Sequence, residues 1–187
     1  MNCYLQVPQG RFELRRFPVR KNETLQAWDA ADEYLLQQLS MLNQTEEAHV
    51  VIVNDSFGAL AVALQAQKPT AISDSFLSQQ ATRENLRLNG FERQGIALID
   101  SLGLPSAAID TLLIKIPKTL ALLEYQLHRL RPFLKTSSLI IAAGMVKNMP
   151  PTGWKLIERL IGPTRPSLAV KKARLLFVDL DPSLTLP

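Results

Sequence analysis

The sequence has few of the side chains that build disulfides, metal sites and nucleophilic active sites. Its 187 residues include one cysteine, Cys3, and two histidines, His49 and His128. A single cysteine excludes an internal disulfide and is typical of proteins in the reducing cytoplasm. Neither histidine has a second ligand at a metal-binding spacing, so we expect no metal site. The nucleophile-elbow and phosphate-loop motifs are also missing, which leaves no sequence evidence for those two chemistries.

Long apolar runs are absent as well. No run approaches the roughly 20 residues that a membrane-spanning helix requires, and residues 139–146 form one of the longest. The first twenty residues contain four arginines and no apolar core, unlike a signal peptide. We therefore expect a cytoplasmic protein without a membrane partner. The apolar share of 47% is nevertheless that of a globular domain with a substantial core.

Positive charge is unevenly distributed along the chain. Residues 1–131 carry 13 basic and 14 acidic side chains, whereas residues 132–187 carry 8 basic and 3 acidic ones. A second basic cluster covers residues 11–21, where five positive side chains accompany Glu13. Such clusters attract phosphate backbones, but they also occur on ordinary solvated surfaces. Charge alone leaves both interpretations open.

Short β-prone runs alternate with stretches of helical periodicity along most of the chain. We expect strands over residues 49–53, 70–73, 96–99, 111–116, 138–145, 167–172 and 174–180. We expect helices over residues 25–39, 59–67, 77–88, 119–130 and 152–161. The expected helix caps are Asn22 or Thr24, Asp74, Thr119 and Thr152. This alternation predicts a three-layer α/β fold, with a mostly parallel sheet between two layers of helices.

The two ends of the chain lack this alternating pattern. Residues 1–21 have mixed polarity and are predicted to form an N-terminal arm or short strands. Residues 22–180 contain the α/β pattern and are predicted to form the domain. Residues 181–187 show no pattern of their own, and we expect them to begin a linker to an absent C-terminal domain.

Five segments carry a resemblance to a known family, namely residues 25–39, 54–60 (NDSFGAL), 81–90 (ATRENLRLNG), 116–124 (IPKTLALLE) and 171–175 (KKARL). Over almost the whole chain, they resemble the N-terminal half of RlmG-type large-subunit ribosomal RNA guanine-N2 methyltransferases, which are related to the RsmC-type small-subunit enzymes. The resemblance implies a class I methyltransferase fold, which is Rossmann-like with seven strands. In that family a C-terminal domain carries S-adenosylmethionine and the chemistry. This chain is therefore expected to be a degenerate copy of the fold.

The turn after the first long apolar strand tests whether the cofactor site is retained. Residues 54–60 contain one glycine, Gly58, where S-adenosylmethionine needs a glycine-rich turn for close backbone approach. Asp74 follows the next strand, where the resemblance implies an acid that binds ribose hydroxyls. We treat Asp55, Gly58 and Asp74 as vestigial positions. The sequence therefore predicts that this chain itself binds no cofactor.

The end of the fourth strand tests whether the chemistry is retained. The resemblance implies Asn-Pro-Pro-aromatic there, where the asparagine accepts hydrogen bonds from the guanine amine and the ring stacks on the base. This chain has Lys115-Ile116-Pro117-Lys118 instead. A lysine has donors but no acceptor, and its charge repels a sulfonium cofactor. We therefore predict no catalytic residue in this chain.

Three hypotheses follow for the function. The first is a non-catalytic domain that binds and positions 23S ribosomal RNA for a catalytic C-terminal domain. Its RNA-binding candidates are Arg11, Arg15, Arg16, Lys115, Lys118, Lys171, Lys172 and Arg174. The second is a purely structural domain that stabilises the catalytic half. The third is an independently active methyltransferase, which the loss of the glycine-rich turn disfavours.

Overall fold

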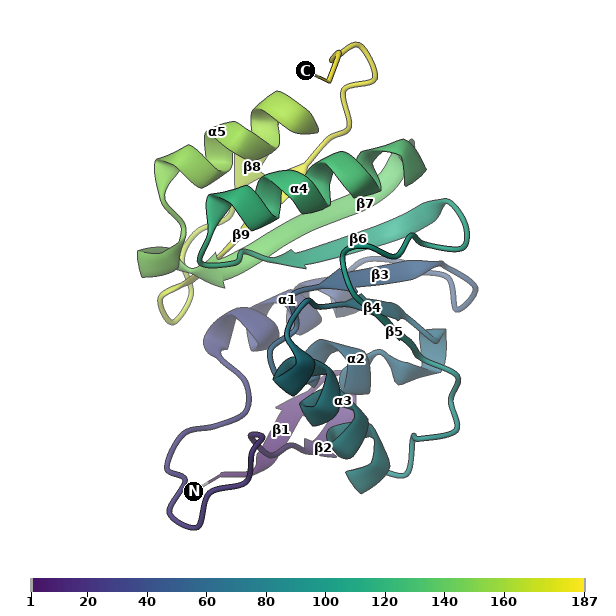
Figure 1. The fold of residues 1–187 in the computed structure, drawn as a ribbon. Coiled ribbons are helices and arrows are strands. Elements are labelled where there is room, and N and C mark those ends of the chain that lie inside the picture. Colours follow the sequence, from purple (N-terminus) through teal and green to yellow (C-terminus); the bar gives the residue numbers. More distant parts are fainter. Residues whose placement is uncertain (1, 187) are drawn as a thin grey trace.

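Seven strands form one central sheet in the computed structural model, which describes residues 2–186 (Figure 1). The strands are β3 (Val50–Val53), β4 (Thr70–Ile72), β5 (Ala97–Ile99), β6 (Ile109–Lys115), β7 (Leu134–Met145), β8 (Thr164–Pro166) and β9 (Ala173–Val178). Their order is β5-β4-β3-β6-β7-β9-β8. β9 is antiparallel to both of its neighbours, and the other pairs are parallel. The predicted α/β fold with a mostly parallel seven-stranded sheet is confirmed.

Helices cover both faces of the sheet. One face packs against α1 (Ala30–Met41), α2 (Ala59–Ala63) and α3 (Phe76–Leu88), and the other packs against α4 (Leu120–Leu130) and α5 (Pro151–Leu160) (Figure 1). The described residues also form three short 3-10 helices, namely η1 (Gln65–Gln67), η2 (Arg131–Phe133) and η3 (Val146–Asn148). No helix among residues 2–186 is both long enough and apolar enough to cross a membrane.

Strand β3 explains why the apolar runs of the sequence are continuous. Val50 and Ile52 point into the core below α1 and α2, whereas Val51 and Val53 point into the core below α4 and α5. All four side chains are fully or almost fully buried. A strand covered on both faces needs apolar residues at every position, as parallel α/β sheets require.

A hairpin of β1 (Tyr4–Val7) and β2 (Gly10–Glu13) precedes the sheet. Leu5, Val7 and Phe12 are buried in the same core as α1 and α2. The side-chain amides of Asn85, on α3, and Asn89, the C-cap of that helix, bind the backbone at the end of β2 and just after it. Asn85 accepts from the nitrogen of Arg15 and donates to its oxygen, and Asn89 does the same for Glu13. These side chains replace a neighbouring strand, because they satisfy backbone groups that would otherwise lack partners.

Helix α1 begins later than predicted, and the expected cap at Asn22 or Thr24 is wrong. Asp29 is the N-cap, and its carboxylate accepts hydrogen bonds from the backbone nitrogens of Ala31 and Asp32. Asp32 returns a side-chain contact to the nitrogen of Asp29, which completes a capping box. The helix is capped at Asp29 rather than at Asn22 or Thr24, because the capping box satisfies backbone nitrogens at both the N-cap residue and the first turn of the helix.

Two other expected caps are also wrong. Ser75, not Asp74, caps α3, and its hydroxyl accepts from the nitrogen of Ser78. Pro150 precedes the first residue of α5, so Thr152 already lies inside the helix. A proline at the start of a helix costs no hydrogen bond, because the first backbone nitrogens have no partner there. Thr119 does occupy the cap position of α4, but its side chain makes no capping bond.

The strand predicted over residues 167–172 is also wrong. The observed strand is β8, which ends at Pro166, and the chain reaches β9 through a tight turn. Lys171 and Lys172 have φ angles of 49° and 65°, which place both in the left-handed region that a strand cannot contain. The turn therefore presents two consecutive lysines at the end of a hairpin.

Candidate functional site

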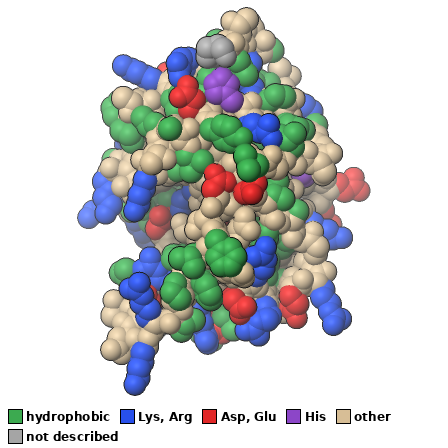
Figure 2. All heavy atoms as spheres, viewed as in Figure 1, with side chains coloured by type: hydrophobic (Ala, Val, Ile, Leu, Met, Phe, Trp, Pro, Cys, Tyr) green, Lys and Arg blue, Asp and Glu red, His purple; other side chains and the backbone are tan. Residues whose placement is uncertain are grey.

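A cavity of about 840 Å³ lies where the parallel strands end. The segments after β3, β4, β6 and β7 line it, because the carboxyl ends of parallel strands meet at one edge of the sheet. In α/β sheets this edge is the usual ligand-binding position, next to the point where the strand order reverses. That reversal lies here between β3 and β6. Figure 2 shows a hollow on one side of the molecule with basic side chains near it.

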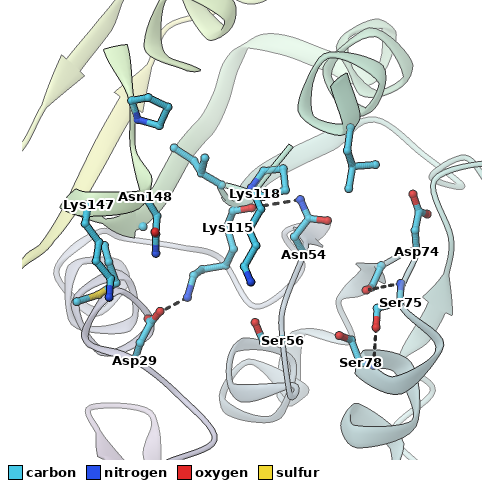
Figure 3. A pocket seen from close by; sticks show the side chains of 17 residues that line it. Asp29, Asn54, Ser56, Asp74, Ser75, Ser78, Lys115, Lys118, Lys147 and Asn148 are labelled. Carbon is cyan, nitrogen blue, oxygen red and sulfur yellow. Dashed lines mark hydrogen bonds and ion pairs between the residues drawn. The ribbon is translucent and has the colours of Figure 1, made fainter. Parts of the chain in front are cut away.

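The reversal point itself is occupied by a pair of side-chain amides. Asn54 follows β3, and its amide nitrogen lies 2.8 Å from Oε1 of Gln126 on α4. Gln126 donates in return to Oδ1 of Asn54 at 2.9 Å. The Asn54 nitrogen also donates to the backbone oxygen of Lys115 at 3.2 Å, which joins the ends of β3 and β6 (Figure 3).

This network continues across the cavity floor. The Gln126 nitrogen lies 3.1 Å from the hydroxyl of Ser101, and the Ser101 backbone nitrogen donates to Asp74 at 2.6 Å. The crevice between β3 and β6 is therefore filled by protein hydrogen bonds. Sequence reasoning missed Gln126 and Ser101, because residues so far apart in the chain meet only through the fold. The polar Gln126 within an otherwise apolar helix face was the one signal that could have found it.

Lys115 has a different environment from the exposed rim that the sequence suggested. It is only 9% exposed, and its ammonium lies 2.7 Å from Asp32 and 3.0 Å from Asp29. Both carboxylates belong to the capping box of α1, so one lysine joins the end of β6 to the start of that helix (Figure 3). Its charge is already paired, and a phosphate would have to displace these carboxylates. We therefore leave Lys115 out of the RNA surface proposed below.

The buried charges shift one another's pKa values. Burial alone would lower the pKa of Lys115, but the charges of Asp32 and Asp29 outweigh it and raise that pKa. Burial opposes ionisation of Asp29 as well, yet the Lys115 charge keeps its pKa below the usual value. Burial raises the pKa of Asp32, and it raises the pKa of nearby Asp55 to about 7 with help from the Asp32 charge. The Lys115 ammonium thus pairs with Asp29 and Asp32, and its charge also acts to lower the pKa of Asp55.

The turn after β3 is built for packing between helices. Asp55 is buried, and its carboxylate accepts a hydrogen bond from the nitrogen of Ala61 at 3.0 Å. Gly58 has a φ of 89°, and a β-carbon there would lie 2.8 Å from the backbone Cα of Thr82 on α3. The glycine is required by the contact between α2 and α3. Ser56, rather than bare backbone, faces the cavity.

Two exposed lysines border the cavity. Lys118 lies in the loop after β6, and Lys147 lies in η3 after β7. Within residues 2–186, neither forms a salt bridge. The predicted candidate Lys118 therefore offers an unpaired charge at this edge, and Lys147 is a neighbour that the sequence reasoning did not single out.

The remaining basic candidates lie on two further segments. Lys171 and Lys172 form the tip of the β8–β9 connection, and the Lys172 oxygen accepts a hydrogen bond from Val146, directly before Lys147. Arg174 is half-buried, with its guanidinium 5.8 Å from the centre of the Trp154 ring. Lys171 is exposed and lies 3.8 Å from Glu33.

The arginines near the N-terminus are held by local contacts. Arg11 lies over the ring of Tyr4, and Arg15 pairs with Glu13 at 2.6 Å. Arg16 lies 4.9 Å from the centre of the Phe57 ring, next to the cavity residue Ser56. Arg16 also lies 3.8 Å from Glu23, and the structure holds Arg11 on the hairpin. No group of three metal-binding side chains gathers within the described part of the chain.

The strand order and the single antiparallel strand β9 define the class of protein. The chain has the fold of the S-adenosylmethionine-dependent methyltransferases. It is similar to the T. thermophilus 16S rRNA N2 G1207 methyltransferase (RsmC) in complex with AdoMet and guanosine, with a TM-score of 0.69 and 14% identity over 95% of this chain and 50% of that one. It is also similar to the ribosomal protein L11 methylase of Lactobacillus delbrueckii subsp. bulgaricus, with a TM-score of 0.57 and 20% identity over 76% and 77% of the two chains.

The family is more specific than the fold. The chain belongs to the RLMG N-terminal domain family, whose model matches residues 2–182. Proteins named "Ribosomal RNA large subunit methyltransferase G" are 46% identical in Streptomyces avermitilis and 48% identical in Pectobacterium atrosepticum. The matches cover 98% and 94% of this chain, but 48% and 46% of those proteins. The chain thus spans about half the length of these curated relatives, and the resemblance inferred from the sequence is confirmed.

Proposed function

We propose that this chain is the non-catalytic, RNA-binding domain of an S-adenosylmethionine-dependent guanine-N2 methyltransferase of large-subunit ribosomal RNA. It positions 23S ribosomal RNA in the cytoplasm, while a C-terminal domain of the same protein binds the cofactor and transfers the methyl group. The observation that carries this proposal is the amide pair of Asn54 and Gln126, which fills the ligand-binding point of the sheet. Unpaired lysines remain around the cavity.

The side chains present do not fit S-adenosylmethionine. A cofactor between β3 and β6 would have to break the reciprocal bonds of Asn54 and Gln126, leaving buried polar groups unsatisfied. The backbone oxygen of Lys115 already accepts a hydrogen bond from the Asn54 amide. Lys118, which forms no salt bridge within residues 2–186, places positive charge beside the position of a sulfonium. Each of these features supports a domain without methyl transfer of its own.

The positive surface supports RNA as the partner. Lys118 and Lys147 border the cavity, and the Lys171–Lys172 turn lies beside Lys147 through the hydrogen bond from Val146 to Lys172. Lysines bind phosphates chiefly as point charges, which gives affinity and placement but little sequence information. Such contacts suit a domain that holds ribosomal RNA while another domain selects the base.

Changing Lys171, Lys172 and Arg174 together to Ala is expected to weaken RNA binding similarly for unrelated sequences. Each phosphate contact adds about 0.7 to the slope of log affinity against log salt for single strands. Losing three contacts therefore lowers the slope by about 2 and the affinity in 0.1 M salt by roughly 10- to 100-fold. Fluorescence anisotropy with two labelled 20-nucleotide RNAs of different sequence, over a salt series, measures both quantities.

The control removes positive charge elsewhere. Lys68 and Arg93 precede β4 and β5, so they lie at the opposite edge of the sheet, and their joint change to Ala should leave RNA affinity within about twofold. Equal losses in both variants would mean that only net charge matters. Unchanged affinity in the triple variant would remove this turn from the RNA surface.

One observation favours a structural role as the second candidate. Leu168 and Val170 are exposed apolar side chains on the β8–β9 connection, and Leu168 is 85% exposed. Apolar side chains beside one another on a surface are typical of contacts with another domain. If the domain has only this structural role, the parent chain should show no salt-dependent RNA binding, or no RNA binding at all.

A further inference from the structure

We propose that the cavity at the carboxyl edge of the sheet holds one unstacked nucleotide of single-stranded RNA. This inference rests on the proposed function and adds a binding site to it. The Asn54–Gln126 pair fills the deep crevice between β3 and β6, where a cofactor would bind, but the cavity still has a volume of about 840 Å³. That volume is within the range of roughly 300–1,000 Å³ typical of small-ligand sites.

One side of the cavity suits a phosphate. β6 and β7 are paired, with Lys115 opposite Ala143, so the loops that follow them leave the sheet side by side. Lys118 and Lys147 come from these two loops, and Figure 3 shows Lys118 reaching toward the middle of the cavity with Lys147 at one side. Both ammonium groups are without a carboxylate partner within residues 2–186. A phosphate bound by Lys118 or Lys147 would gain a charged donor without breaking an ion pair of that lysine.

The rest of the lining suits a ribose and a base. Ile116, Pro117 and Met145 give the lysine side an apolar surface on which a base can lie. Asp74 lies on the far side of the cavity from Lys147 (Figure 3), and Ser73, which also lines the cavity, precedes it directly after β4. Their oxygens can accept hydrogen bonds from ribose hydroxyls. The Asp74 carboxylate is thus separated from the lysine side, where a phosphate would lie. Asp29 also lines the cavity on the lysine side, but its charge is paired with Lys115.

The shape of the site favours single-stranded over paired RNA. A nucleotide can enter a concave pocket only if its base is unstacked and unpaired, whereas a duplex offers only its outer phosphates to the rim. Phe76, the first residue of α3, follows the lining residue Ser75 and is 69% exposed. An exposed ring beside such a cavity provides a surface on which a neighbouring base can stack.

The test compares one single-stranded RNA with a hairpin of equal length and composition. Changing Lys118 and Lys147 together to Ala is expected to weaken single-strand binding about tenfold in 0.1 M salt, and hairpin binding less than twofold. Phe76→Ala should also weaken only the single strand, roughly fivefold. All three residues are exposed, so circular dichroism and thermal melting should match the parent chain. The paired variant of Lys68 and Arg93 is again the control for lost charge.

The possible outcomes separate this inference from the proposed function. Selective loss of single-strand binding supports the nucleotide site. Equal weakening for both RNAs overturns it, since the lysines would then be general phosphate contacts, and the RNA-binding function would stand. Binding should be strongest at low salt, and about 0.05 M is the low end of the salt concentrations commonly used for such measurements. If the parent chain shows no measurable RNA binding there, both the nucleotide site and the proposed function are overturned. Unchanged binding by both variants would overturn the nucleotide site alone.

Discussion

The Lys115→Ala chain is expected to be less stable than the parent by roughly 3–5 kcal/mol at pH 8, the cost typical of breaking a buried ion pair on one side. The change removes the only ammonium within hydrogen-bonding distance of Asp29 and Asp32 in the described residues. It also removes the nearest positive charge that lowers the pKa of buried Asp55. Three carboxyl groups would then remain at the start of α1 and α2 without a counter-charge.

The loss should depend on pH in one direction. Without Lys115, the folded-state pKa values of these carboxyl groups rise. Those of Asp32 and Asp55 are already above the ordinary value in the parent chain, and that of Asp29 rises from below it. A raised folded pKa gives stability that is present below the unfolded value, near pH 4, and lost as the pH rises through the folded value. For Asp55 that value is already about 7 in the parent chain. The deficit of the variant should therefore be small at pH 5 and large at pH 8.

Urea unfolding at both pH values measures this difference. Lys118→Ala is the matched control, because Lys118 is exposed, forms no salt bridge within residues 2–186 and lies three positions along the same segment. Adding Asp32→Asn to Lys115→Ala should recover part of the stability at pH 8, since one unpaired charge is removed. A deficit that is equal at pH 5 and pH 8 would contradict the assignment of this cluster as a buried charge centre.

Gly162→Ala should lower the free energy of unfolding by roughly 2–6 kcal/mol, combining backbone strain with overpacking. Gly162 follows the end of α5 with a φ of 152°, where residues 179–181 cross directly over it. A β-carbon at this position would overlap the backbone oxygen of Asp179 and lie 2.8 Å from the nitrogen of Asp181. Neither atom belongs to a flexible side chain, so the backbone itself has to move.

Gly153→Ala in the same helix is the control. Gly153 has ordinary helical surroundings, and its added methyl group would meet only the Leu120 side chain at 3.5 Å. Alanine is the better helix former by about 1 kcal/mol, so this variant should be as stable as the parent or slightly more stable. Thermal and urea unfolding of the two variants compare them directly. Similar stabilities for both would show that the crossing at Gly162 is not a close one.

Much of the fold could be predicted from periodicity, because burial acts on every position of an element. The continuous apolar runs of residues 111–116 and 139–143 indicated strands covered on both faces, as observed in β6 and β7. The helix starts were harder to predict, because several residues near each start could act as caps. Asp29 prevails over Asn22 and Thr24 because Asp32 completes its capping box. The strand expected over residues 167–172 was misplaced because Lys171 and Lys172 adopt positive φ angles that their residue type does not signal, whereas the strand expected over residues 174–180 is observed as β9.

The site was less predictable than the fold. The sequence showed that Lys115 and Lys118 follow the same strand, but not that one is buried against two carboxylates and the other is exposed. That difference arises because Lys115 is the last residue of the paired strand and points toward α1, whereas Lys118 lies in the loop. The partners of Asn54 come from α4 and β6. Contacts of this kind depend on tertiary structure and leave no local pattern.

Calorimetric titration of this chain with S-adenosylmethionine tests most directly whether the sheet edge has lost its cofactor. We expect no saturable heat up to roughly millimolar ligand, the weak limit of specific binding, because Asn54, Gln126 and Lys115 already use the groups that a cofactor would need. Clear one-to-one binding would contradict this result. It would mean that the network opens for the ligand, and an independently active methyltransferase would then become the leading hypothesis.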